Sequence, residues 1–173
     1  MKKILKVVIL LALAIAWMVV IFELSSMNAV ESGSRSRAII SKFIEDAVDT
    51  TTRYGYTDYT PSEERIEQVS LFLHIPLRKL AHATVYLILA IFVFALTTIF
   101  YNHNHYFKSL LVALVICILF AISDEFHQSF VPGRDSEIMD VVIDSCGAAV
   151  GIILSSIHYL TYELGYRAAK RGG

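Results

Sequence analysis

The chain has 173 residues, an ordinary length for a single domain. Its residues are 55% hydrophobic and 18% charged, whereas a soluble domain has roughly 45–50% apolar and about 25% charged residues. The formal net charge is -1 and the pI is about 6.6, so the basic balance of a nucleic-acid-binding domain is absent and we expect no nucleic-acid partner. The mean hydropathy of +0.58 excludes an ordinary soluble globule and predicts an integral membrane protein.

Four apolar segments are candidates for membrane-spanning helices, which need about 20 apolar residues each. We place the spans at about residues 4–23, 80–101, 107–126 and 138–160, within one domain that covers residues 1–173. The first apolar run is longer than the hydrophobic region of a secretory signal, and we interpret it as an uncleaved anchor. The predicted fold is all-α, an integral membrane four-helix transmembrane bundle.

Basic residues near the ends of the spans predict the orientation. They precede the first span, lie between the second and third, and follow the fourth: Lys2, Lys3, Lys6, Lys108, Arg167, Lys170 and Arg171. Because cytoplasmic ends of spans carry an excess of Lys and Arg, we expect a multi-pass protein with both termini in the cytoplasm. The loop over residues 24–77 would then lie outside.

This external loop contains two patterns of amphipathic helices. Over residues 36–48, apolar residues recur on one helical stripe. Thr60 and Glu63 form a capping box, with Pro61 at the first helical position, and predict the start of a second helix. We expect short amphipathic helices here, lying at the outer membrane surface or covering the bundle.

Two of the apolar runs are too short to cross the membrane unless they include acidic residues. The third run reaches about 20 residues only with Asp124 and Glu125, and the fourth only with Asp140 and Asp144. A carboxylate near the bilayer centre costs about 2.5–3.5 kcal/mol on insertion scales, and less toward the interface. We therefore expect these four acids to face protein rather than lipid.

The fourth span continues from its two aspartates into a pair of glycines. Gly147 and Gly151 follow Asp140 and Asp144 on the same helical face and form a G-x-x-x-G spacing. This spacing lets a second helix approach closely. The face that carries the aspartates is therefore predicted to pack against another span.

Basic, imidazole and amide side chains occur at the same predicted level of the membrane as the acids. Steps of four residues place Arg78, His82 and Tyr86 on one face of the second span. The predicted functional cluster comprises Arg78, Lys79, His82, Tyr86, Asp124, Glu125, His127, Gln128, Arg134, Asp140 and Asp144. We expect its cations to balance its acids around a polar pocket that opens on the outer face.

The end of the third span supplies much of this cluster. Spacings of three and four residues place Asp124, His127 and Gln128 on one helical face, while Glu125 points partly aside. A single turn after the span can fold Arg134 back over the site.

Three classes of function fit the cluster. In a binding protein, Arg78, Lys79 and Arg134 would contact a phosphate or carboxylate. In a membrane-embedded hydrolase or transferase, His127 or His82 would act as general base. In a structural or partner protein, the ion pairs would only fix the register of the helices. We favour the binding protein and assign no catalytic residue.

Serine nucleophiles and a metal ion are further alternatives. Serines occur near the ends of the spans, where proximity alone makes them candidate nucleophiles: Ser25, Ser26, Ser123 and Ser129. Ser25 and Ser26 are otherwise interpreted as the polar end of the first span. The histidines and acids of the cluster have metal-ligand chemistry, but the sequence contains no H-x-x-x-H or H-E-x-x-H pair. We expect no cofactor and keep a divalent metal as an alternative.

The two cysteines are too few for a disulfide framework in a chain of this length. Cys117 and Cys146 lie in apolar runs without a C-x-x-C spacing, and we predict that both are buried free thiols.

The order of these motifs resembles the VanZ-like family, small bacterial membrane proteins named for a teicoplanin-resistance accessory protein. The resemblance is carried by Ser25-Ser26, Arg78-Lys79-x-x-His82-x-x-x-Tyr86, Asp124-Glu125-x-His127-Gln128-x-Phe130-x-Pro132-Gly133-Arg134 and Asp140-x-x-x-Asp144-x-x-Gly147. It implies a role in the cell envelope at the bacterial cytoplasmic membrane. In some members that role is linked to lower susceptibility to teicoplanin-type lipoglycopeptide antibiotics. Besides the lipid bilayer, the implied partners are an envelope lipid, a wall precursor or the lipoglycopeptide itself.

Overall fold

The computed structural model describes residues 1–101, 105–134 and 136–171, without the side chains of residues 163 and 166–171. The side chains of Arg167, Lys170 and Arg171, three of the basic residues from which the orientation is predicted, therefore lie outside the described part of the chain. The described residues form five helices and no strand: α1 (Lys2–Ser25), α2 (Ala29–Arg53), α3 (Glu63–Tyr101), α4 (Tyr106–Gln128) and α5 (Ile138–Arg171). The predicted all-α class is confirmed.

Four of these helices have the length and apolar character of membrane spans. They are α1, α3, α4 and the Ile138–Tyr162 part of α5. Large apolar side chains point outward along them, including Ile15 of α1, Leu119 of α4 and Ile153 of α5, each more than half exposed. Apolar surface of this extent marks contact with a membrane or a partner. The predicted four-span membrane bundle is confirmed.

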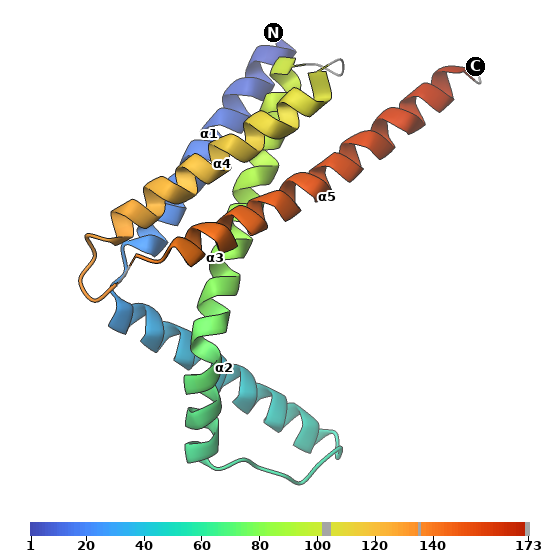
Figure 1. Cartoon of the computed structure of the whole chain (residues 1–173). Coiled ribbons are helices and arrows are strands. Elements are labelled where there is room, and N and C mark those ends of the chain that lie inside the picture. The colour runs from blue at the N-terminus through green and yellow to red at the C-terminus, as the bar shows by residue number, and fades with distance from the viewer. Residues whose placement is uncertain (102–104, 135, 172–173) are drawn as a thin grey trace.

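The spans associate at one end of the molecule and separate toward the other. In Figure 1, α1 and α4 run beside the second half of α3, while α5 crosses α3 and diverges from the other spans toward its C-terminal end. The N-terminus and the C-terminal end of α5 lie at the same end of the structure, and α2 crosses the first half of α3 at the opposite end (Figure 1). An even number of spans produces this common placement of the termini.

Small residues allow α5 to cross α3 closely. Gly147 packs against the backbone of Ala83 and Gly151 against that of Leu87, and a Cβ atom at either glycine would collide with the opposing carbonyl oxygen. The close approach predicted from the G-x-x-x-G spacing is present. On the other side of α3, the Trp17 indole Nε1 donates a hydrogen bond to the Val85 carbonyl at 2.8 Å and ties α1 to the bundle.

α3 is longer than the second span predicted from the sequence. It is one helix of 39 residues with Pro76 inside it, rather than a short surface helix followed by a separate span. Its N-cap is Ser62, whose Oγ accepts from the Arg65 N–H at 3.3 Å. The predicted capping box at Thr60 is therefore wrong, because the serine nearer the helix takes this role and Pro61 stays outside the helix. At about 1.5 Å per residue, α3 is roughly twice as long as the hydrocarbon core is thick.

α2 corrects the expectation of short helices in the external loop. It has 25 residues and begins at Ala29, capped by the Asn28 side chain, which accepts from the Glu31 N–H at 2.9 Å. The sequence pattern missed this first part because it is polar. Ile40 is buried against α3, whereas Ile39 and Phe43 are exposed on the other side of the stripe.

Both cysteines are free, but only one is buried. Cys117 lies in the bundle core, whereas Cys146 is exposed. The prediction of a buried thiol at Cys146 is therefore wrong. Asp144 and Gly147 are buried on the inward face of α5 at this level, and Cys146, two residues after Asp144, lies about 200° around the helix from it and faces outward.

Candidate functional site

Four helices bring polar side chains to one level of the bundle. α1 and α4 end here, α5 begins here, and α3 passes through (Figure 1). Ser25, Asp124 and Asp144 are almost completely buried at this level, with exposed fractions of 1%, 0% and 2%. The acids expected to face protein do so.

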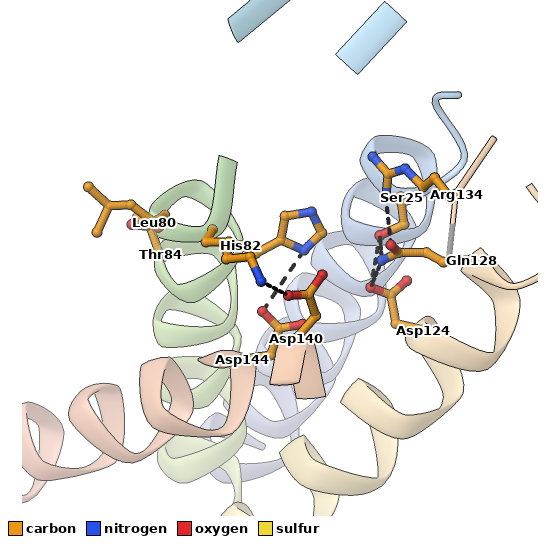
Figure 2. Close-up of polar contacts among 10 residues, drawn as sticks. Ser25, Leu80, His82, Thr84, Asp124, Gln128, Arg134, Asp140 and Asp144 are labelled. Carbon is orange, nitrogen blue, oxygen red and sulfur yellow. Dashed lines mark hydrogen bonds and ion pairs between the residues drawn. The ribbon is translucent and has the colours of Figure 1, made fainter. Parts of the chain in front are cut away.

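One hydrogen-bond network joins α1, α4 and the loop that follows α4 (Figure 2). Ser25 Oγ donates to Asp124 Oδ2 at 2.8 Å, and Gln128 Nε2 donates to the same oxygen at 3.3 Å. Arg134 Nη1 in turn donates to Gln128 Oε1 at 2.6 Å. The loop can return over α4 because Gly133 adopts a φ of +74°, a backbone conformation that favours glycine.

A second network joins α3 to the start of α5. Lys79 Nζ lies 2.8 Å from Asp140 Oδ1 and 3.1 Å from Glu137 Oε2. The backbone N–H of Glu137 donates to Glu125 Oε1 at 2.6 Å, so the buried Glu125 holds the start of α5 against the end of α4. This network fixes the loop whose Arg134 takes part in the first network.

Between the two networks, three side chains converge without direct hydrogen bonds to one another. His82, Asp124 and Asp144 each offer one nitrogen or oxygen atom, and these atoms lie within 4.8 Å of one another. His82 Nδ1 lies 3.9 Å from Asp144 Oδ1 (Figure 2). Asp124 Oδ1, Asp144 Oδ1 and Tyr86 Oη are buried and make no hydrogen bond to any described residue.

A cavity of about 370 Å³ opens beside this centre, between α1, α2, α3 and the loop after α4. Its lining is mostly apolar and includes some cationic and hydroxyl groups: Ile21, Leu24, Ser25, Met27, Ser32, Arg35, Ser36, Ile39, Leu77, Arg78, Ala81, His82, Val85 and Arg134. Arg134 has two buried nitrogens, Nε and Nη2, that make no hydrogen bond to any described residue. Burial lowers the pKa of its guanidinium and the nearby charge of Arg78 lowers it further, while the acids Asp124, Glu125 and Asp140 offset part of this change.

The chain matches the VanZ/LLP1 family over residues 10–159. This range includes both polar networks and the cavity. The chain belongs to the VanZ/LLP1 family. The resemblance noted from the motifs is therefore confirmed, and no curated protein and no solved structure matches the chain.

In this VanZ/LLP1 protein, His127 lies apart from the other members of the predicted cluster. Its Nε2 is 3.1 Å from Ser26 Oγ, and its ring packs edge-on against Phe22 with centroids 5.0 Å apart. The expectation that Asp124, His127 and Gln128 share a face holds only for Asp124 and Gln128. The His127 ring instead packs between Ser26 and Phe22 of α1, on the side of α4 away from the Asp124–Gln128 contact.

Ser26 is the one serine of the four nucleophile candidates that the structure brings to His127. Its Oγ also donates to the Phe22 carbonyl at 2.7 Å. Because a hydroxyl has a single proton, the Phe22 carbonyl competes with His127 Nε2 for the Ser26 proton that a general base would accept. Ser123 and Ser129 are exposed.

The sequence-based cluster omitted two residues of the VanZ/LLP1 site, Ser25 and Glu137. The sequence predicts Ser25 as the polar end of the first span, but it is buried and bonded to Asp124. The signal in the sequence is a serine directly after an apolar span, at the level of the membrane acids. Glu137 pairs with Lys79 from a loop with no helical periodicity, and no sequence signal marked it.

Proposed function

We propose that this protein acts in the cell envelope by binding the anionic headgroup of a membrane amphiphile in the cavity between α1, α2 and α3. The observation that carries the proposal is the pair Arg78 and Arg134. Both line the cavity, and two buried nitrogens of Arg134 have no acceptor among the described residues. An anionic oxygen placed between the two guanidinium groups would supply the missing acceptors.

The electrostatics of the cavity support an anion rather than a neutral ligand. Arg78 and Arg134 repel each other, and Gln128 gives Arg134 only a neutral acceptor. The guanidinium group binds phosphate and carboxylate oxygens in a bidentate geometry, which a neutral headgroup cannot match. A bound phosphate would also offset the repulsion between the two arginines.

The apolar lining supports a ligand that carries a hydrocarbon chain. Ile21, Leu24, Leu77 and Val85 line the cavity where α1 reaches its C-terminal end. Ligand sites are typically concave and largely apolar, with a few polar groups that set the orientation. The shared chemistry is thus a phosphate or carboxylate close to an acyl or prenyl chain, as in an anionic phospholipid, a polyprenyl-linked wall precursor or a lipoglycopeptide.

The proposed orientation places this cavity at the outer leaflet of the bacterial cytoplasmic membrane. Lys2, Lys3 and Lys6 are exposed at the opposite end of the bundle, and Lys108 lies in the first turn of α4 at that end. The excess of positive charge favours the cytoplasm for that end. An outward cavity would meet ligands of the cell wall and antibiotics.

The test is binding to the purified full-length protein in nanodiscs of neutral phosphatidylcholine. Three probes are titrated: phosphatidylglycerol, a polyprenyl pyrophosphate and teicoplanin. We expect one of them to bind, and the Arg78→Gln and Arg134→Gln variants to bind it at least about tenfold more weakly, because each loses a charge-assisted contact. Arg53→Gln is the control, because Arg53 is exposed and pairs with Asp49. Equal binding by all variants would contradict the proposal.

The antibiotic arm has its own readout in cells. If teicoplanin is the ligand, expression of the wild-type protein raises the inhibitory concentration of teicoplanin, and the Arg134→Gln variant does not at equal membrane levels. If a phospholipid or wall precursor is the ligand, that lipid binds in the nanodisc titration. The inhibitory concentration of teicoplanin then changes with the amount of that lipid in the membrane.

A further inference from the structure

We propose that His82, Asp124 and Asp144 bind one divalent transition-metal ion, Zn²⁺ or Mn²⁺, at the inner end of the cavity. The three ligands come from α3, α4 and α5. The proposal does not depend on the headgroup-binding function, because it is carried by a different set of contacts.

The geometry of the three side chains is close to that of a metal centre. Their ligand atoms lie within 4.8 Å of one another, and His82 Nδ1 lies 3.9 Å from Asp144 Oδ1. Metal bonds of about 2.0–2.2 Å to nitrogen and oxygen hold neighbouring ligand atoms roughly 3–4 Å apart. Small side-chain rotations are enough to bring the ligand atoms from separations of up to 4.8 Å to those of a metal centre, because Asp144 and His82 already point toward each other (Figure 2).

The charge balance at this position favours a bound cation. Asp124 and Asp144 are buried in the bundle, and one oxygen of each makes no hydrogen bond to any described residue. Lys79 pairs with Asp140 and Glu137 and Arg134 bonds to Gln128, while Asp144 forms an ion pair with His82 at 3.9 Å when that imidazole is protonated. A single imidazole carries at most one positive charge against these two buried carboxylates, and a divalent ion would neutralise both.

The residues around Asp124 hold its carboxylate by hydrogen bonds, as the neighbours of a metal ligand usually do. Ser25 and Gln128 donate to its Oδ2, which leaves Oδ1 free and fixes the plane of the carboxylate. In metalloproteins, hydrogen bonds of this kind from neighbouring residues orient the side chains that bind the metal. The hydroxyl of Tyr86 is fully buried beside this carboxylate.

The ligand set indicates the class of metal and leaves room for a further ligand. One imidazole with two carboxylates suits Zn²⁺ or Mn²⁺ better than Mg²⁺, which prefers oxygen ligands, or Cu⁺, which prefers sulfur. Three protein ligands leave at least one coordination position open. His82 and Ser25 also line the cavity, so this position lies at the cavity's inner end.

Metal content and affinity of the full-length protein in detergent test the proposal. After chelator treatment the protein is titrated with Zn²⁺, Mn²⁺ and Mg²⁺ by calorimetry, and the bound metal is counted by elemental analysis. We expect about one Zn²⁺ or Mn²⁺ per chain. His82→Gln, Asp124→Asn and Asp144→Asn should each bind at least about tenfold more weakly, the size of effect seen even for residues that support ligands.

Two variants match the ligand substitutions in chemistry but lie elsewhere. His127→Gln alters an imidazole that contacts Ser26, and Asp49→Asn alters an exposed carboxylate on α2. Both should bind the metal as the wild type does. The proposal is overturned if the wild type binds neither ion, or if the three ligand variants bind as tightly as the two controls.

A measurement on the wild type alone guards against variants that do not fold. The X-ray absorption spectrum of the Zn²⁺-loaded protein should show a shell of nitrogen and oxygen atoms with a single imidazole. A sulfur atom in that shell, or two or more imidazoles, would place the ion at Cys117, Cys146 or another histidine and overturn the assignment.

Discussion

The hydroxyl of Ser25 donates to the carboxylate of Asp124 at 2.8 Å, across 99 residues of sequence. The contact joins the last residue of α1 to the last turns of α4, and both side chains are buried. It also holds one oxygen of Asp124 while the other stays free. A polar contact between two spans therefore sets the geometry of the carboxylate at the centre of the site.

Ser25→Ala should destabilise the protein by about 1–3 kcal/mol, because it removes a donor from a buried carboxylate. The neighbouring Ser26→Ala variant is the control. Ser26 is exposed and donates to a carbonyl of its own helix, so its loss should change stability by less than about 0.5 kcal/mol. Equilibrium unfolding in mixed detergent micelles measures both. Equal effects of the two substitutions would show that the Asp124 contact contributes little.

Gly147→Ala should separate α3 from α5 and destabilise the bundle by roughly 2 kcal/mol or more, because the new methyl group would collide with the Ala83 backbone. Gly165→Ala, on the same helix, is the matched control. A Cβ atom at Gly165 has open space around it, so alanine there should stabilise the helix by up to about 1 kcal/mol. Thermal unfolding followed by circular dichroism compares them. A stabilising effect at Gly147 would contradict the observed helix crossing.

The spans and the buried acids could be predicted from sequence because bilayer thickness constrains both. The third and fourth apolar runs are too short to span the bilayer alone, and this shortfall predicts that Asp124 and Asp144 lie inside the bundle. The lengths of α2 and α3 could not be predicted in the same way. The thickness of the bilayer does not limit the length of their polar parts, which are held by the packing of α2 on α3.

The partners of the site residues depend on tertiary structure. Asp124 is about 60° from His127 and about 40° from Gln128 around the α4 axis, so periodicity alone could not separate them. The position of α1 determines which residue pairs with Asp124. His127 contacts Ser26 of α1, and Gln128 bonds to Asp124. The grouping of His82 with Asp124 and Asp144 was equally hidden, since the three come from three helices and form no local motif.

Ser26→Ala and His127→Ala should leave headgroup binding within about twofold of the wild type, and a fluorophosphonate probe should not label Ser26. The reason is that the Phe22 carbonyl, at 2.7 Å from the Ser26 hydroxyl, competes with His127 Nε2, at 3.1 Å, for the single hydroxyl proton. The nanodisc titration and mass spectrometry of the probe-treated protein provide the measurements. Labelling of Ser26 that requires His127 would instead support the hydrolase alternative.

Single-cysteine labelling should place α2 outside the cell and the α3–α4 turn inside. In a background with Cys117 and Cys146 replaced by alanine, Ser34→Cys on exposed α2 should react with a membrane-impermeant maleimide in intact cells. Lys108→Cys, exposed at the start of α4, should react only after the membrane is permeabilised. The expected pattern follows from the lysines near the ends of α1 and α4, which favour the cytoplasmic side. The opposite pattern would put the cavity at the inner leaflet, where lipids of that leaflet can reach it and externally added teicoplanin cannot.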